Sequence, residues 1–324
     1  MPPDSPSAHA SSLLPLPPDH SSSLAAVWFA GEHESAPDVR IAFSSFVRAD
    51  QHWTLTRYIV SRESLGVSLG FGIRRLGNPV LWKDSQDRLH LFVVGTGPGG
   101  WAASRIIHLE QANDTSDLGQ LAFKPRQVLP LSWLWNISHL VRNAPLPMED
   151  GSAALPVYFE IGAKYPVIAN ISLTGDFTGM TRISSRRNLL QPALVALDSA
   201  HWMAYMRMSG GTQRIAVAET SDAGKHWHDL PDLPLPNPNA AIAATGFKGL
   251  QVMAFNPSIN GRDTLSLATA TDGRNWTTIA ELEKGKAGDE FSYPAMAWTD
   301  NALWVSYTNR REKISWQRFS LAKD

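Results

Sequence analysis

Short apolar runs alternate with polar turns along the whole chain. Examples of these runs are "SLAAVWFA", "RLHLFVV", "WMAYMRM" and "ALWVSYT". No segment longer than about a dozen residues shows the sustained 3.6-residue period of an amphipathic helix. The pattern predicts an all-β protein built from many short strands, with almost no helix.

One polar turn recurs along the chain. In residues 220–227, "TSDAGKHW", Asp222 can bond the backbone that follows it, Gly224 can adopt a positive φ, and Trp227 can fold back over the turn. A shorter copy and two worn copies occupy residues 271–276, 44–53 and 172–180. Strands with such turns, repeated about every 40–50 residues, are typical of radial β-repeats. We expect these segments to be outer hairpin turns that build blades and form no part of a site.

The length and composition fit one large β domain. The 324 residues include 12 tryptophans, 23 glycines and 22 prolines, which suit many strands and many turns. With about four strands in a blade, the length is sufficient for six blades. No Pro/Ser-rich linker interrupts the chain internally. The sequence therefore predicts a single six-bladed β-propeller over residues 1–324.

Charge and cysteine content exclude several classes of function. The formal net charge of −1 argues against a nucleic-acid-binding surface spread over the protein. No apolar run reaches the ~20 residues of a membrane span, and residues 1–19 lack the basic and apolar regions of a signal peptide. The absence of cysteine excludes thiolate nucleophiles and leaves the compartment open. We expect a monomer without nucleic-acid or membrane partners.

Neither a metal nor a cofactor is expected. His33 lies directly between Glu32 and Glu34, which is a poor spacing for metal ligands, and no second histidine cluster supports it. Residues 95–100, "GTGPGG", lack the lysine and the following helix of a phosphate-binding loop. We interpret that segment as a loop at a channel mouth or between blades.

Several further motifs follow one another in the order of a known superfamily. They are "NPVLW" (residues 78–82), "LPNPNAA" (235–241), "FNPSINGRDTLSLATATDGRNW" (255–276), "EFSYPA" (290–295) and "YTNRREKI" (307–314). With the recurring turns, they resemble the sialidase superfamily, and most closely its BNR-repeat-like branch, from His9 to about Trp316. The resemblance implies a six-bladed propeller with a site at the mouth of its central channel. It also implies hydrolysis of a terminal acidic sugar.

The superfamily uses three arginines for the substrate carboxylate, a carboxylic acid/base, and a tyrosine nucleophile paired with a glutamate. Arginine forks match a carboxylate bidentately. A tyrosine with a pKa near 10 needs a neighbouring base before it can attack. The resemblance places the second arginine at Arg207 and the third at Arg262. It places the nucleophile at Tyr293.

The acid falls in the loop "GEHESAPD", where the resemblance favours Glu34 over three rivals, Glu32, His33 and Asp38. Three further residues are candidates for substrate binding: Asn78, Tyr158 and Arg310. Asn143 is a lesser candidate for the rim of the site.

Two positions depart from the family pattern. His9 stands where the first arginine is expected, and Gln191 stands where the glutamate that activates the tyrosine is expected. A neutral amide cannot accept the tyrosine's proton, and a missing general base costs about 10²–10⁴ in rate. A substitute carboxylate is therefore needed, and Glu160 and Glu290 are the candidates.

Three functions remain open. The first is a sialidase-type glycoside hydrolase. The second is a polysaccharide lyase, in which Arg207, Gln191 and Asn78 would neutralise a uronate while His9 and Tyr293 act as base and acid. The third is a non-catalytic glycan-binding propeller. For either enzyme, we expect the candidates to converge at one channel mouth, namely His9, Glu34, Asn78, Gln191, Arg207, Arg262 and Tyr293.

Overall fold

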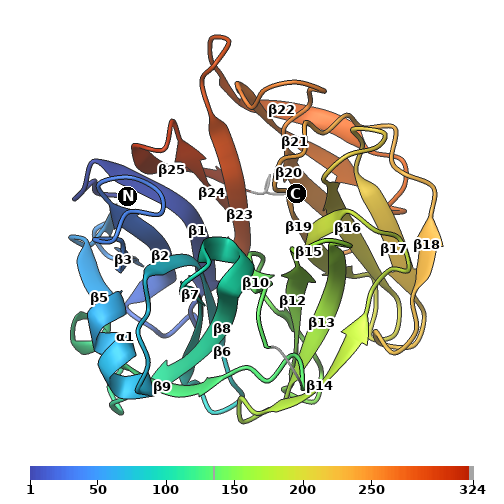
Figure 1. The fold of residues 1–324 in the computed structure, drawn as a ribbon. Helices are drawn as coiled ribbons and strands as arrows, with labels where there is room; N and C mark the ends of the chain where they lie inside the picture. Colours follow the sequence, from blue (N-terminus) through green and yellow to red (C-terminus); the bar gives the residue numbers. More distant parts are fainter. Residues whose placement is uncertain (134–135, 321–324) are drawn as a thin grey trace. The chain divides into compact units, whose positions relative to one another are not determined.

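The protein is a six-bladed β-propeller. The computed structural model describes residues 1–133 and 136–320, which contain 25 strands, one α-helix and two short 3-10 helices. The strands form six sheets, and the recorded strand pairs within them are antiparallel (Figure 1). The predicted all-β propeller class is confirmed.

The chain divides into two compact units. Unit 1 comprises Met1–Val141 together with the segment from Met296 onward, and unit 2 comprises Arg142–Ala295. The expectation of a single domain over residues 1–324 stays a prediction.

Unit 1 holds two complete sheets and most of a third. Their orders are β1-β2-β3-β4 with β5 on β3, then β6-β7-β8-β9, and the pair β24-β25. The elements are β1 (Ser7–Pro15), β2 (Ser22–Gly31), β3 (Arg40–Val47), β4 (His52–Trp53), β5 (Arg57–Ser61), α1 (Arg62–Leu69), β6 (Arg75–Lys83), β7 (Leu89–Thr96), η1 (Gly100–Ala103), β8 (Ser104–Gln111), η2 (Leu118–Gln120), β9 (Phe123–Val128), β10 (His139–Val141), β24 (Ala302–Asn309) and β25 (Lys313–Ser320).

Unit 2 holds the strands coloured green to orange in Figure 1. Its sheets are β12-β13-β14 with β11 on β12, then β15-β16-β17-β18 and β19-β20-β21-β22. The elements are β11 (Leu146–Pro147), β12 (Ala153–Phe159), β13 (Tyr165–Ile171), β14 (Phe177–Arg182), β15 (Leu189–Ala196), β16 (Trp202–Met208), β17 (Ala216–Thr220), β18 (His228–Leu230), β19 (Ala243–Phe247), β20 (Leu250–Phe255), β21 (Thr264–Ala270) and β22 (Thr277–Lys284). Strand β23 (Phe291–Thr299) begins in unit 2 and ends in unit 1.

Strand β16 shows why the apolar runs lack a polar face. Trp202 and Ala204 belong to one buried cluster, whereas Met203 and Tyr205 belong to another. Successive side chains point to opposite faces of a strand, so both faces of this sheet are buried. A strand buried on both faces reads as a continuous hydrophobic run, and this explains "WMAYMRM".

The two clearest copies of the recurring turn connect β17 to β18 and β21 to β22, as predicted hairpin turns should. In both, the tryptophan indole donates to a glycine carbonyl: Trp227 Nε1 to Gly224 O at 3.0 Å, and Trp276 Nε1 to Gly273 O at 3.1 Å. Both glycines have positive φ, of 83° and 69°. Backbone N–H groups of the turn hydrogen-bond to Asp272 and hold the pKa of its carboxyl down at about 2.

The expectation of almost no helix agrees with the structure, in which α1 is a short helix of eight residues. Ser61 and Ser64 form a capping box at its start, and Gly70 ends it with a φ of 71°. Reciprocal capping of this kind satisfies backbone donors at a helix N-terminus. The sequence signal is local and lies in "SRESLGVSLG", which carries no clear apolar stripe.

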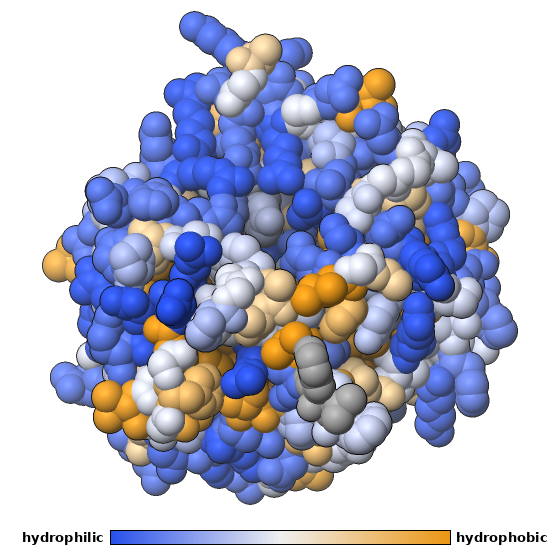
Figure 2. All heavy atoms as spheres, in the orientation of Figure 1, coloured by the Kyte–Doolittle hydropathy of each residue, from blue (hydrophilic) through white to orange (hydrophobic). Residues whose placement is uncertain are grey.

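The visible surface is mostly hydrophilic, with hydrophobic residues in small separate groups (Figure 2). In the described part of the chain, no helix is long and apolar enough to span a bilayer.

Candidate functional site

Four candidate residues lie at or beside backbone irregularities in the first strand of a sheet. Asn78, Gln191 and Tyr293 have positive φ values of 41°, 52° and 52°, and Ala10, next to His9, has 54°. The strand register shifts at these positions in β1, β6 and β15, as at a β-bulge. Such left-handed non-glycine residues cost on the order of 1–3 kcal/mol and cluster at functional sites. The strain therefore marks the positions that the motifs had selected.

In unit 2, Gln191 lies between Arg207 and Tyr158. Its Oε1 accepts from Arg207 Nη1 at 3.1 Å, and its Nε2 donates to Tyr158 Oη at 3.3 Å. Gln191 and Tyr158 are buried, with exposed fractions of 3% and 2%. Burial raises the pKa of Tyr158 far above its ordinary value of 10. Its hydroxyl is therefore neutral and offers no base.

Asn239 joins the two predicted arginines. Arg207 Nε donates to its side-chain Oδ1 at 2.6 Å, and Arg262 Nη2 donates to its main-chain oxygen at 3.1 Å. Asn239 has a φ of 55°, a conformation that asparagine tolerates better than most residues. The two guanidinium groups are thus brought together as predicted, through a residue that the sequence interpretation did not single out.

Glu290 binds a guanidinium nitrogen of Arg262 that Asn239 does not bind. Its Oε1 accepts from Arg262 Nη1 at 3.0 Å and from Ser292 Oγ at 2.6 Å. A main-chain bond from Phe291 N to Arg262 O, at 2.8 Å, holds the start of β23 against this arginine. Arg262, Glu290 and Tyr293 therefore form one neighbourhood.

Two guanidinium groups flank Tyr293. The Arg142 Cζ lies 5.3 Å from the centroid of its ring and the Arg262 Cζ lies 5.9 Å from it, within the usual range of a cation–π contact. Arg142 is 2% exposed and donates from Nη2 to Pro294 O at 2.7 Å. Burial lowers its pKa to about 10, so it is charged at neutral pH.

Sequence interpretation missed Arg142. Its only local signal is an arginine at the end of the apolar run "HLV". The next residue, Asn143, was a lesser candidate. Asn143 Nδ2 donates to Gln191 O at 3.2 Å and to Pro192 O at 3.0 Å.

Unit 1 holds the remaining candidates. His9 is 1% exposed and its ring contacts Phe29 edge-on, with centroids 5.2 Å apart. Asn78 is 9% exposed. The residue before it, Gly77, leaves room for Trp101, because a Cβ there would lie 2.8 Å from the indole. Trp101 follows the glycine-rich segment 95–100, which begins with the last two residues of β7 and continues into the connection to β8.

Glu34 is ion-paired with Arg311. The main-chain oxygen of Arg311 accepts from Ala8 N at 2.9 Å, so the turn after β24 lies beside the start of β1. Its neighbour Arg310 has a φ of 52° and is exposed. Asp38 was one of the alternatives to Glu34. Its carboxylate binds the backbone of its own loop, because Asp38 Oδ2 accepts from Glu32 N at 2.9 Å.

Unit 2 therefore brings together Tyr158, Gln191, Arg207, Arg262 and Tyr293. Convergence of these residues with His9, Glu34 and Asn78, which belong to unit 1, stays a prediction. Within the described residues, no group of three or more His, Asp or Glu side chains is placed to hold a metal ion.

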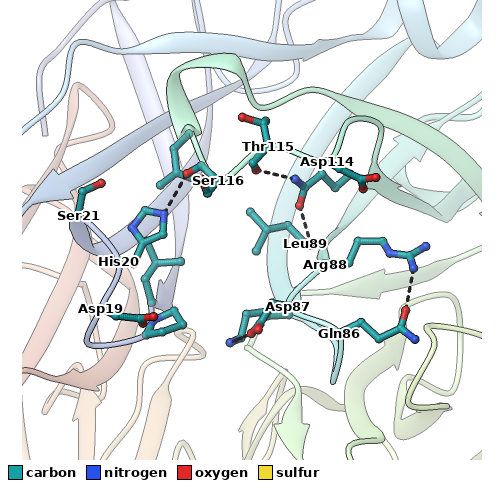
Figure 3. Close-up of a pocket in the computed structure, with 15 residues that line it drawn as sticks. Asp19, His20, Ser21, Gln86, Asp87, Arg88, Leu89, Asp114, Thr115 and Ser116 are labelled. Carbon is teal, nitrogen blue, oxygen red and sulfur yellow. Dashed lines mark hydrogen bonds and ion pairs between the residues drawn. The ribbon is translucent and has the colours of Figure 1, made fainter.

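A separate cleft of about 670 Å³ opens in unit 1. Figure 3 shows its polar lining, in which His20, Gln86, Asp114 and Ser116 are visible. None of the predicted site residues lines it. The cleft is therefore distinct from both groups of candidates.

The comparisons with known proteins agree with this fold. The family model of the BNR repeat-like domain matches residues 22–305. No curated protein sequence matches the chain. Among solved structures, the Hadza microbial sialidase Hz136 has a TM-score of 0.80 at 15% identity, over 98% of this chain and 66% of that chain.

Two further sialidase structures are similar. The NanB sialidase from Streptococcus pneumoniae has a TM-score of 0.71 at 11% identity, over 98% of this chain and 69% of that chain. Trypanosoma rangeli sialidase in complex with the inhibitor DANA has a TM-score of 0.70 at 14% identity, over 96% of this chain and 54% of that chain. This chain thus spans between 54% and 69% of these structures, and at such identities the likeness concerns the fold alone. The match of the family model over residues 22–305 confirms the resemblance, and the chain belongs to the BNR repeat-like domain family.

Proposed function

We propose that the protein is a sialidase-type glycoside hydrolase that releases a terminal acidic sugar, sialic acid or a relative, from a glycan. Arg207 and Arg262 hold the sugar carboxylate. Tyr293 attacks the anomeric carbon or stabilises the oxocarbenium ion, and Glu34 is the general acid.

The observation that carries this proposal is the arginine pair at Asn239. In the described residues, the hydrogen bonds of Arg207 go only to the amide oxygens of Asn239 and Gln191. Neutral acceptors orient a guanidinium without cancelling its charge. Arg207 is therefore preorganised for an anion, and a planar carboxylate is the partner that matches its fork.

The nucleophile needs a base that is not Gln191. Its amide is already engaged with Arg207 and Tyr158, and an amide takes up no proton at neutral pH. We assign the task to Glu290, three residues before Tyr293, with Glu160 as the alternative. A Glu290→Gln variant tests the assignment, because loss of the base should lower kcat by about 10²–10⁴.

Solved relatives of the fold support the choice of substrate class. Trypanosoma rangeli sialidase has been solved with sialic acid and, as a covalent intermediate, with 2,3-difluorosialic acid. Those ligands belong to that enzyme. For this chain, they identify the reagents with which the proposal is tested.

A time course on a mixed panel of sialosides and uronate polysaccharides tests the function. Release of free nonulosonic acid supports the hydrolase, and a Tyr293 adduct with 2,3-difluorosialic acid supports the nucleophile. A new conjugated C=C absorbance without free sugar would replace the hydrolase with a lyase. Binding of the glycans without any turnover would favour a non-catalytic glycan-binding propeller.

One observation favours the lyase as second candidate. Gln191 is neutral and lies beside Arg207, and an amide with a guanidinium can neutralise a uronate carboxylate by hydrogen bonding. Asn78 would assist. In β-elimination, one of His9 and Tyr293 would remove the carbon-bound proton, and the other would protonate the leaving oxygen. His9→Ala should then abolish activity as completely as Tyr293→Phe.

A further inference from the structure

Two strands in unit 2 place a strained residue directly before a proline, and each such pair is called a bulge below; in β15 the register of the ladder shifts at this point. The pairs are Gln191–Pro192 in β15 and Tyr293–Pro294 in β23, where Gln191 and Tyr293 each have a φ of 52°. Proline donates no backbone hydrogen bond, so each bulge lacks one ladder bond. Left-handed conformations of bulky residues persist only where the surroundings enforce them. Something outside the two strands must therefore hold the bulges.

Two consecutive residues make the holding contacts. Asn143 Nδ2 donates to both main-chain oxygens of the first bulge, Gln191 O at 3.2 Å and Pro192 O at 3.0 Å. Arg142 Nη2 donates to the main-chain oxygen of the second, Pro294 O at 2.7 Å. One dipeptide thus contacts two strands that are about a hundred residues apart in the chain.

Both donor residues of these contacts are buried. Arg142 and Asn143 are 2% and 7% exposed. A buried charge is costly unless it is well hydrogen-bonded, so a guanidinium is an expensive choice for a purely structural position. Its stacking over the Tyr293 ring, at 5.3 Å, adds a second contact that fixes the same residue.

We propose that Arg142 and Asn143 form a positioning element that sets Tyr293 and Gln191 relative to each other by holding their bulges. Arg142 acts on Tyr293, and Asn143 acts on Gln191 and, through it, on Arg207. The effect on turnover rests on the hydrolase function proposed above, whereas the effect on the backbone does not. A displacement of about 1 Å at a reacting group can cost 10²-fold in rate.

The test uses three variants of the full chain. Arg142→Met removes the donor and the charge, Arg142→Lys keeps a charged donor, and Asn143→Ala removes the other donor. Arg182→Met is the matched control. Arg182 also donates to a main-chain oxygen, Ser184 O at 2.7 Å, and lies over a tyrosine ring, Tyr165, at 4.6 Å, but it contacts neither bulge.

Backbone hydrogen exchange is the first measurement. Arg142→Met should speed exchange in peptides that cover residues 291–295 and leave residues 189–194 unchanged. Asn143→Ala should do the reverse, and Arg182→Met should change neither. Unchanged exchange at both bulges would overturn the proposal, whether or not the protein is an enzyme. If Arg142→Met does not fold, Arg142→Lys and Asn143→Ala decide the question.

Sialoside turnover is the second measurement. Arg142→Met should lower kcat at least about tenfold with KM and DANA affinity nearly unchanged, because Arg207 and Arg262 remain in place, and Arg142→Lys should restore part of the loss. A wild type that cleaves sialosides, together with an Arg142→Met variant of equal kcat, would overturn the positioning role. A wild type that cleaves none would overturn the proposed function, and hydrogen exchange would still decide this inference.

Discussion

Each unit contains a buried polar network, and the two networks treat charge differently. In unit 1, the Asp84 carboxylate is hydrogen-bonded to His90 Nε2 at 3.1 Å, and His90 Nδ1 to His108 Nε2 at 2.8 Å. The other oxygen of Asp84 accepts from the backbone N–H of Gln86 and Arg88, both at 2.9 Å. Neighbouring groups of the protein therefore satisfy this carboxylate by hydrogen bonding. Within the described part of unit 2, the hydrogen bonds of Arg207 go to the neutral oxygens of Asn239 and Gln191, which leave its charge in place.

The comparison shows that burial and polarity alone do not identify a site. In the unit 1 network, Asp84 accepts from the backbone of Gln86 and Arg88, two residues that line the cleft of Figure 3, and the cleft offers an obvious cavity. Its Lys83 and Asp87 are paired with each other, so these two charges neutralise each other. Arg207 is oriented without being neutralised, whereas Arg262 beside it is paired with Glu290, so the distinction applies to Arg207 and not to the whole candidate cluster.

The largest expected effect concerns Tyr293. Tyr293→Phe should abolish turnover and leave the melting temperature nearly unchanged, because only one hydroxyl is lost from a half-buried ring. Steady-state kinetics and thermal unfolding measure both. Tyr165→Phe, in β13 and stacked on Phe159, is the control and should remain active. Full activity in Tyr293→Phe would show that the Tyr293 hydroxyl takes no part in the reaction and would overturn both enzyme schemes in their present form.

The next effect tests whether Arg207 carries available charge. Arg207→Met should raise KM by about 10- to 100-fold, since a charge-assisted hydrogen bond contributes about 1.5–3 kcal/mol. Asn239→Ala should raise KM less, because the main-chain oxygen that holds Arg262 remains.

Arg186 supplies the control for that prediction. It is already paired with Asp232 at 2.7 Å, so Arg186→Met should leave KM unchanged. Equal effects of Arg207→Met and Arg186→Met would contradict the distinction between neutralised and available charge.

A third prediction uses the buried histidines of unit 1. Burial lowers the pKa of His139 to about 4, and it lowers the pKa of His90 as well. Both are below the unfolded value of about 6.5, so the unfolded chain binds protons first. The stability that the neutral forms provide is complete above about pH 6.5 and is lost as pH falls towards 4. For His139 the loss approaches about 3 kcal/mol.

Urea unfolding at pH 7 and pH 4.5 measures this loss, and His139→Phe should reduce it. Hydrogen exchange should show unit 1 opening before unit 2, whose histidines, His201, His226 and His228, are exposed. A free energy of unfolding that does not change between the two pH values would show that histidine burial is not what separates the units.

The smallest expected effect lies in the cleft. Asp19→Asn and Asp114→Asn, on two of its walls, should change turnover by less than about twofold and stability by less than about 0.5 kcal/mol. The same assays measure both. A large loss of activity in either variant would move the site into unit 1.

The fold was predictable because its signals are local. Alternating strands, Asp/Gly turns and their tryptophans are each read within a short window, and the structure shows the same indole-to-carbonyl bond in both clear turns. The position of helix α1 was not predicted because its capping serines are weak signals without an apolar stripe.

The grouping of candidate residues within unit 2 was predictable only where a motif carried it. Arg207, Arg262, Gln191 and Tyr293 were placed by family order, and unit 2 does bring them together. Arg142 escaped notice because its partner, Pro294, is 152 residues away. Asn239 escaped because its role depends on two arginines, Arg207 and Arg262, that are distant from it in the sequence. Long-range hydrogen bonds of this kind leave no pattern in one sequence.

The proline-flanked bulges have a consequence for how this scaffold changes over evolution. Asn78, Gln191 and Tyr293 each precede a proline and share a left-handed backbone. The main-chain conformation, and not the type of side chain, fixes the position and direction of the Cα–Cβ bond of such a residue. An amide, a carboxylate or a phenol can therefore be exchanged at the same point without rebuilding the strand. Relatives with one backbone can thus acquire different chemistry through single substitutions, which is how a common fold comes to host unrelated reactions.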